Sequence, residues 1–170
     1  MTTICYKDGV MASDSRVAIE SEDTGVTHIY SAAKLYRKTI QPTKQKLLAG
    51  GAIRKINDGK PFDVIIGLAG ESSPGLVFLD WYGSGDPEPE SINGAESTAD
   101  FTALILTPDG LFSADGYCRP EQILDEFYAV GTGSHAAMGA MYSGKTAAEA
   151  VEIAAKIDVY TALPLQVMKL

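Results

Sequence analysis

The chain opens with Met1-Thr2-Thr3-Ile4-Cys5-Tyr6-Lys7-Asp8-Gly9-Val10-Met11-Ala12-Ser13-Asp14-Ser15-Arg16, and this stretch determines how its first strands pair. Two apolar runs, 3–6 and 10–13, flank Lys7-Asp8-Gly9, and Asp-Gly between apolar runs predicts a tight β-hairpin. A hairpin of this length returns the chain to its own start. We therefore expect Asp14 and Arg16 to lie beside the first residues of the protein.

Polar groups gathered around a chain start make chemical sense if the first residue is reactive. Met1 precedes a small residue, so an aminopeptidase could remove it and leave Thr2 with a free α-amine beside its own hydroxyl. An α-amine titrates near pH ~8 and can accept the hydroxyl proton during attack on a carbonyl. Nucleophile and base would then share one residue. The alternative interpretation is that Thr2 and Thr3 are ordinary β-branched residues that open a strand.

Length and composition predict one globular domain covering residues 1–170. Apolar residues make up 45% of the 170-residue chain and charged residues 21%, which is ordinary for a domain with a sizeable core. The net charge of -8 argues against nucleic acid or an anionic membrane as a partner, because an acidic surface repels both. No apolar run approaches the ~20 residues of a membrane span.

The cysteines and histidines are too dispersed to indicate a metal site. Cys5 and Cys118 are far apart and are most simply reduced core thiols, which favours a cytoplasmic protein. His28 and His135 are single histidines, and the N-terminus lacks the features of a signal peptide. We expect no metal and no cofactor.

The first half of the chain predicts strands interrupted by one helix. An irregular segment is expected over Val17–Ile29, and then a single strand over Tyr30–Arg37 in which Lys34 and Leu35 point to opposite faces. The remaining expected elements are a long hairpin or flap over Gln41–Asp63, a buried strand over Asp63–Gly70, and a helix over Ser72–Tyr82 with Leu76, Phe78 and Leu79 toward the core.

The second half adds a hairpin and two helices. In order, the expected elements are a solvated acidic loop over Gly83–Asp100, a hairpin of Phe101–Leu106 and Leu111–Ala114, a strand over Phe127–Val130, a Gly-rich turn over Gly131–Ser134 opening a helix to Tyr142, a helix from Thr146 to Ile157, and a final strand over Asp158–Thr161. Thr146 and Glu149 have the spacing of a capping box. This pattern favours sheets covered by helices in layers.

The order of these motifs resembles the N-terminal-nucleophile (Ntn) threonine peptidases of the 20S proteasome β-subunit and HslV family. The matching segments are Thr2-Thr3-Ile4, Lys7–Val10, Ala12–Arg16, Lys34-Leu35-Tyr36, Gly67–Gly70, Gly131-Thr132-Gly133, and Asp158 with Thr161. Each motif is short, and their agreement in order over most of the chain makes the resemblance specific.

The resemblance implies an α+β fold, a four-layer αββα sandwich with the site at one end of the sheets. It implies that Thr2 is the nucleophile, that Lys34 paired with Asp14 lowers the pKa of the hydroxyl, and that the N–H of Gly70 stabilises the oxyanion. It further implies that a group of polar residues in the last quarter of the chain holds the α-amine in position. These residues are Thr132 or Ser134, Asp158 and Thr161.

Several features depart from the family pattern. The first hairpin is shorter, Thr132 replaces a serine, and the segment Gln41–Pro61 is longer than the usual connection. The acidic loop Gly83–Asp100 stands where a second long helix is expected, so that helix is predicted to be reduced. Family members assemble into rings through their helices. The resemblance therefore implies a ring-shaped homo-oligomer, provided that the remaining helices are enough to form the contacts between subunits.

Three activities fit these residues. The first is hydrolysis of peptides or unfolded proteins, with an ATPase unfoldase as a partner that the family allows. The second is an Ntn amidohydrolase acting on a small amide, because one nucleophile serves both classes. The third is an inactive ring or scaffold subunit, against which the retained Thr2, Asp14 and Lys34 argue.

Overall fold

In the computed structural model, which describes residues 2–20, 27–41, 60–84 and 100–170, the chain begins with the predicted hairpin. Strands β1 (Thr3–Lys7) and β2 (Val10–Ser13) pair antiparallel, with Ile4 opposite Ser13. Asp8 and Gly9 between them have φ angles of 52° and 76°. A type I′ turn needs positive φ at both central residues, so the Asp-Gly pair explains the tight return.

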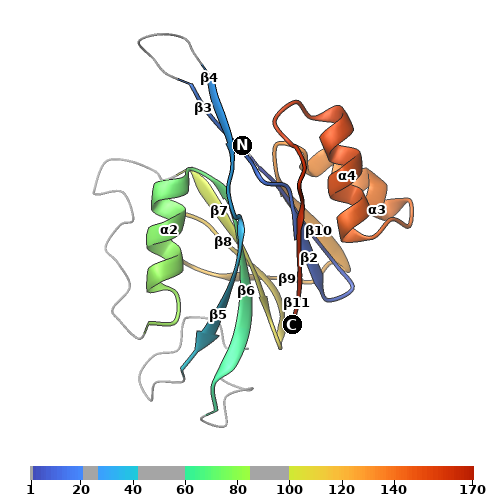
Figure 1. Ribbon diagram of the computed structural model, residues 1–170. Helices are drawn as coiled ribbons and strands as arrows, with labels where there is room; N and C mark the ends of the chain where they lie inside the picture. Colours follow the sequence, from blue (N-terminus) through green and yellow to red (C-terminus); the bar gives the residue numbers. More distant parts are fainter. Residues whose placement is uncertain (1, 21–26, 42–59, 85–99) are drawn as a thin grey trace. The chain divides into compact units, whose positions relative to one another are not determined.

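The first of two compact units contains residues 1–35 and 126–169. Its four-stranded sheet has the order β10-β1-β2-β11, with β10 at Phe127–Gly131 and β11 at Gln166–Lys169. Every pairing in it is antiparallel. Helices α3 (Ser134–Tyr142) and α4 (Ala147–Ile157) lie together along this sheet (Figure 1). Both helices start within two residues of their predicted positions.

Small side chains fill the space between this sheet and its helices. The buried residues of this core are Cys5, Ala12, Ala129, Ala137, Ala140, Met141, Ala147, Ala150, Val151 and Ala154. Alanines let the helices approach the sheet closely, so α3 and α4 hold β1 firmly. Thr146 and Glu149 form the predicted capping box, with both reciprocal hydrogen bonds present.

A second hairpin follows β2, where the sequence suggested an irregular segment. Strands β3 (Arg16–Glu20) and β4 (Thr27–Ser31) pair antiparallel, with Arg16 opposite Ser31. The irregular prediction for Val17–Ile29 was wrong because every residue of β4 is exposed. A strand with two exposed faces has no alternation of apolar and polar residues to reveal it.

The predicted strand over Tyr30–Arg37 is divided in two. β4 ends at Ser31 and β5 (Leu35–Ile40) begins four residues later. The break contains Lys34, which is 5% exposed, and it is fixed by hydrogen bonds rather than by a strand partner. The N–H of Ala32 donates to the carbonyl of Ser15, and the N–H of Lys34 donates to Oε1 of Gln166 at 2.6 Å.

The second unit covers residues 36–125. Its five-stranded sheet has the order β5-β6-β7-β8-β9. The bounds of the other strands are Phe62–Gly70 for β6, Phe101–Thr107 for β7, Gly110–Ala114 for β8 and Glu121–Ile123 for β9. The buried strand and the hairpin predicted here are confirmed, whereas β9 was not foreseen because it is short and exposed.

Helix α2 (Ser72–Trp81) packs on this second sheet and confirms the predicted helix (Figure 1). Phe78 is fully buried and Leu79 packs partly against the core, as expected. The placement of Leu76 toward the core was wrong, since 44% of it is exposed. Pro74 and Phe78, four residues apart, form the buried face, and Leu76 projects from the opposite side of the helix.

The final strand was predicted too early. Residues 158–161 form a turn, and β11 starts at Gln166. The turn is stabilised by Asp158, whose Oδ1 accepts a hydrogen bond from the N–H of Tyr160 at 3.1 Å. Aspartate side chains commonly close such turns two residues ahead.

Some of the expected elements fall mainly on residues outside the ranges 2–20, 27–41, 60–84 and 100–170. Most of the flap over Gln41–Asp63 and of the acidic loop over Gly83–Asp100 lies outside the described residues, as does the question of a reduced second helix. The single domain over residues 1–170 stays a prediction. In the described part of the chain, every helix is too short or too polar to cross a membrane.

Candidate active site

The chain start and Asp14 come together because of the β1–β2 hairpin. The N–H of Thr3 donates to Oδ1 of Asp14 at 2.9 Å, and the N–H of Asp14 donates to the carbonyl of Thr3 at 3.1 Å. Thr2, Thr3 and Asp14 are all buried. The sequence prediction that the carboxylate of Asp14 faces the first residues is therefore confirmed.

Lys34 forms a buried ion pair with Asp14. Its Nζ lies 2.8 Å from Oδ1 of Asp14, and their side chains are 5% and 0% exposed. The same Nζ donates to the carbonyl of Arg16 at 2.6 Å. Gln166 fixes the backbone here, because its Oε1 accepts from the N–H groups of Lys34 and Leu35.

Both oxygens of the Asp14 carboxylate accept hydrogen bonds. Besides Lys34 and Thr3 on Oδ1, its Oδ2 accepts from the N–H of Arg16 at 3.0 Å and of Ala162 at 3.3 Å. The carboxylate thus accepts from four donors, one ammonium and three backbone N–H groups. Asp14 is therefore an anchor for three chain segments as well as the counter-ion of Lys34.

Burial tunes the Lys34 ammonium. Desolvation lowers the pKa of Lys34 below its ordinary value, although the hydrogen bond and charge of Asp14, and the charge of Asp158, act in the opposite direction. A lysine with a lowered pKa exchanges its proton more readily near neutral pH. The pair can therefore take part in proton transfer and also supply positive charge.

Cys5 is the other potential nucleophile on β1, and its surroundings disfavour that role. Burial, together with the negative charge of Asp14, raises the pKa of the Cys5 thiol to about 12. Because the thiolate is the reactive form, Cys5 stays inert at neutral pH. This leaves the threonines as the nucleophile candidates at the chain start.

Asp158 gathers the late polar residues into one network. Its Oδ2 accepts from Oγ1 of Thr132 at 2.6 Å and from Oγ1 of Thr161 at 2.6 Å. Burial opposes the charged form, but these hydrogen bonds and the one from Tyr160 leave the pKa of Asp158 lowered overall. The predicted grouping of Thr132, Asp158 and Thr161 is therefore present, whereas Ser134 instead opens α3.

The hydrogen bonds of this network have a defined direction. An ionised carboxylate only accepts, so Thr161 uses its single hydroxyl proton on Asp158. Oγ1 of Thr3 lies 2.6 Å from Oγ1 of Thr161 and must therefore donate to it. The N–H of Gly133 in turn donates to Oγ1 of Thr3 at 3.1 Å. Protons thus point one way, from Gly133 through Thr3 and Thr161 to Asp158.

Two glycines allow β1 to lie against the 131–133 turn. A Cβ on Gly131, whose φ is +94°, would meet the carbonyl oxygen of Thr2 at 1.8 Å. A Cβ on Gly133 would meet Oγ1 of Thr3 at 2.3 Å. The N–H of Thr132 can consequently donate to the carbonyl of Thr2 at 2.9 Å. Both glycines are needed for this close approach, a role the sequence showed only as a Gly-rich turn.

Thr3 proves to be more central than the sequence suggested, and we expect Thr3→Val to destabilise the protein by about 1–3 kcal/mol. Valine keeps the shape but removes the hydroxyl, so the buried N–H of Gly133 loses its acceptor and Thr161 loses its donor. Urea unfolding followed by circular dichroism measures this change. Thr3→Ser restores both hydrogen bonds and serves as the control. Equal unfolding midpoints for Thr3→Val and the unmodified protein would contradict the network.

Gly70, predicted to supply the oxyanion amide, lies in the second unit. It ends β6 with a φ of +97°, and an added Cβ would meet the carbonyl oxygen of Asp100 at 2.1 Å. The backbone there requires glycine. Its catalytic role stays a prediction.

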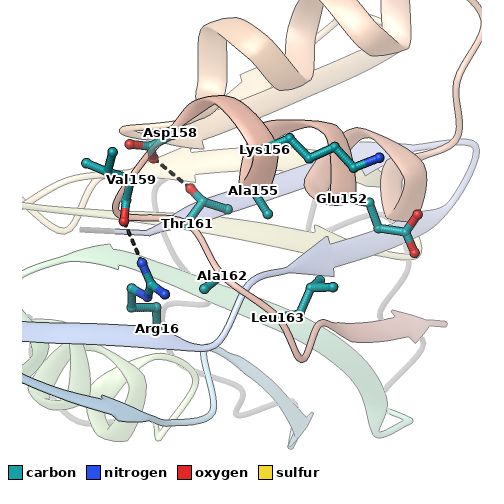
Figure 2. Close-up of a pocket in the computed structure, with 9 residues that line it drawn as sticks. All are labelled: Arg16, Glu152, Ala155, Lys156, Asp158, Val159, Thr161, Ala162 and Leu163. Atoms are coloured by element: carbon teal, nitrogen blue, oxygen red, sulfur yellow. Dashed lines mark hydrogen bonds between the residues drawn. The ribbon is translucent and has the colours of Figure 1, made fainter.

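A cavity of about 470 Å³ adjoins the Asp158 network within the first unit (Figure 2). Its lining comes from α4, from the turn after it and from the start of β3. Charged groups of both signs reach it, with Arg16 and Lys156 positive and Glu152 and Asp158 negative. Within the described residues, no three His, Cys, Asp or Glu side chains come together to hold a metal ion.

Comparison with solved structures shows that the chain shares the fold of several HslV-like proteins. BPH of Thiobacillus denitrificans is 21% identical, with 99% of this chain and 97% of that one covered and a TM-score of 0.57. HslV from Trypanosoma brucei is 18% identical over 98% and 97% of the two chains, with a TM-score of 0.60. Anbu, an ancestral β-subunit from Yersinia bercovieri, is 13% identical over 99% and 81%, also at 0.60.

These likenesses confirm the fold class predicted from the sequence and the resemblance to HslV-like proteins at the level of fold. The chain matches no protein-family profile and no curated relative. At such low identity, the shared fold leaves the chemistry to be argued from the site itself.

Proposed function

We propose that this protein is a threonine peptidase that hydrolyses peptide bonds with Thr2 as its N-terminal nucleophile, once Met1 has been removed. The observation that carries the proposal is the buried ion pair of Lys34 and Asp14, tied through the N–H of Thr3 to the strand that Thr2 precedes. A buried lysine–aspartate pair is costly to maintain, so its position directly beside the chain start favours a chemical role over a merely structural one.

In the proposed reaction, Oγ1 of Thr2 attacks the peptide carbonyl and its proton passes to the α-amine of the same residue. Lys34 lowers the pKa of the hydroxyl, and the N–H of Gly70 stabilises the oxyanion. The amine proton goes to the leaving peptide amine as the C–N bond breaks. Water then hydrolyses the resulting ester and regenerates Thr2.

The Asp158 network would hold the α-amine as a base. Thr132 and Thr161 both donate to Asp158, which keeps its carboxylate charged and fixed. A fixed negative charge near an amine stabilises its protonated form, which favours transfer of a proton to the amine. Thr132 thus replaces the serine of the resembled family without losing the hydroxyl.

Two of the similar structures suggest how this protein could be tested with an inhibitor and that it could form an oligomer. BPH of Thiobacillus denitrificans has also been solved in complex with epoxomicin, and it resembles this chain with a TM-score of 0.58. Anbu from Pseudomonas aeruginosa has been described as a helical assembly. We propose that this protein is a cytoplasmic homo-oligomer, arranged as a ring, that acts on peptides or unfolded proteins and works with an ATPase unfoldase.

The test joins mass spectrometry with two substrate classes. Intact mass first establishes whether Met1 is absent, and the mature protein is then incubated with an epoxyketone peptide such as epoxomicin. We expect one adduct, located on Thr2, and hydrolysis of fluorogenic peptides in preference to small amides. Preference for small amides would instead support the amidohydrolase alternative. A mature protein that neither hydrolyses peptides nor forms an adduct would overturn the proposal.

A further inference from the structure

Arg16 was singled out by the sequence beside the chain start, yet the proposed mechanism gives its side chain no role. Its backbone already serves the site, because the N–H donates to Asp14 and the carbonyl accepts from Lys34. Any residue type could make those two bonds. The third bond needs a long cationic side chain, since Nη1 of Arg16 donates to the carbonyl of Val159 at 2.6 Å (Figure 2).

Val159 belongs to the turn that presents two members of the Asp158 network. Asp158 precedes it and Thr161 follows two residues later. The two central residues of this turn contribute little side-chain packing, because Val159 is 73% exposed and Tyr160 is 42% exposed, whereas Thr161 is buried. A segment with few buried side chains is held mainly by its polar bonds. The bond from Arg16 is charge-assisted, which makes it stronger than a neutral hydrogen bond.

The cavity beside this bond does not indicate an anion site. Arg16 and Lys156 line it, but Glu152 and Asp158 line it as well, so its charges offset one another. Arg16 lines this cavity, so protein atoms do not surround its side chain on every side. The hydrogen bond to the carbonyl of Val159 therefore fixes the position of the guanidinium.

We propose that Arg16 is a positioning residue that couples the two halves of the site. Through its backbone it fixes Lys34 and Asp14, and through its guanidinium it fixes the 158–161 turn that carries the Asp158 network. Displacement of that turn would misplace Asp158 and Thr161, and a misplacement of about 1 Å can cost an enzyme about 100-fold in rate. The kinetic part of this inference depends on the proposed peptidase function.

The experiment compares Arg16→Ala with Lys156→Ala, which removes a positive charge from the same cavity wall. In Arg16→Ala we expect faster deuterium uptake in peptides covering 158–163, and a fall in kcat of roughly 10- to 100-fold with KM changed less than about twofold. Lys156→Ala should change neither quantity. Arg16→Lys keeps one charged donor, should give intermediate values, and replaces the alanine variant if that variant does not fold.

Each outcome decides the inference. Unchanged deuterium uptake in Arg16→Ala would overturn it, whatever the activity, because the turn would then be held by other contacts. Equal losses of kcat in Arg16→Ala and Lys156→Ala would also overturn it in favour of a general charge effect. If the unmodified protein is inactive, the proposed function fails, and the deuterium uptake still tests whether Arg16 holds the turn.

Discussion

Thr2→Ala should reduce peptide hydrolysis by on the order of 10⁴-fold or more, while the protein stays folded. The substitution removes the attacking oxygen and keeps the backbone of the chain start. Thr2 contributes its carbonyl to the hydrogen bond from the N–H of Thr132, and alanine retains that carbonyl. The close approach of Gly131 to Thr2 likewise involves backbone atoms only. Steady-state kinetics and circular dichroism of the purified variant measure the two expectations.

Two further variants separate the nucleophile from its base. Thr2→Ser keeps an Oγ and should retain part of the activity. A chain with an uncleavable residue before Thr2 should be inactive, because an amide nitrogen cannot act as a base. Thr3→Ala tests the neighbouring threonine, and we expect it to lower the stability of the protein more than its activity. Full activity with Met1 retained would exclude the mechanism.

Removal of Asp14 should destabilise the protein more than removal of Lys34. Asp14→Ala leaves the Lys34 ammonium buried without its carboxylate and takes the acceptor from three backbone N–H groups. Loss of one partner of a buried ion pair costs about 3–5 kcal/mol. Lys34→Ala leaves the carboxylate with those three N–H donors, so its cost should be nearer about 1–3 kcal/mol. Urea unfolding midpoints provide the comparison.

Asp14→Ala and Lys34→Ala should both lose turnover, although they differ in their effect on stability. Loss of turnover in both would show that the two residues share a chemical role. Because Lys34 is buried, its removal should lower stability as well as turnover. Lys34→Met controls for packing volume and should be stable but inactive. Lys34→Arg should not restore turnover, because a planar guanidinium does not fit a compact ammonium site and does not release its proton. Similar unfolding midpoints for Asp14→Ala and Lys34→Ala would contradict the four-donor arrangement around Asp14.

Local signals made much of this architecture predictable. The Asp8-Gly9 turn requires positive φ angles that those residue types tolerate, and so the first hairpin and the position of Asp14 follow from four or five neighbouring residues. The capping box of Thr146 and Glu149 similarly marks the start of α4. Strands with a buried face, such as β6 and β7, were recognisable from their apolar runs.

The sequence failed where long-range contacts set the local conformation. β4 has no buried face and exists through its pairing with β3, so periodicity could not reveal it. The break at Lys34 is fixed by Gln166, a residue 132 positions away. No window of neighbouring residues contains such a partner.

By itself, then, the sequence determined the hairpin at the chain start, the main helices, and the residue types available at the site: a threonine to attack, a lysine and an aspartate to pair. Only the tertiary structure decided their environment. It buried Lys34 against Asp14, gave Thr3 its place between Gly133 and Thr161, and brought Arg16 to the turn after α4. The physical reason is that burial and hydrogen-bond direction depend on groups distant in sequence, whereas turns and helix caps depend on neighbours.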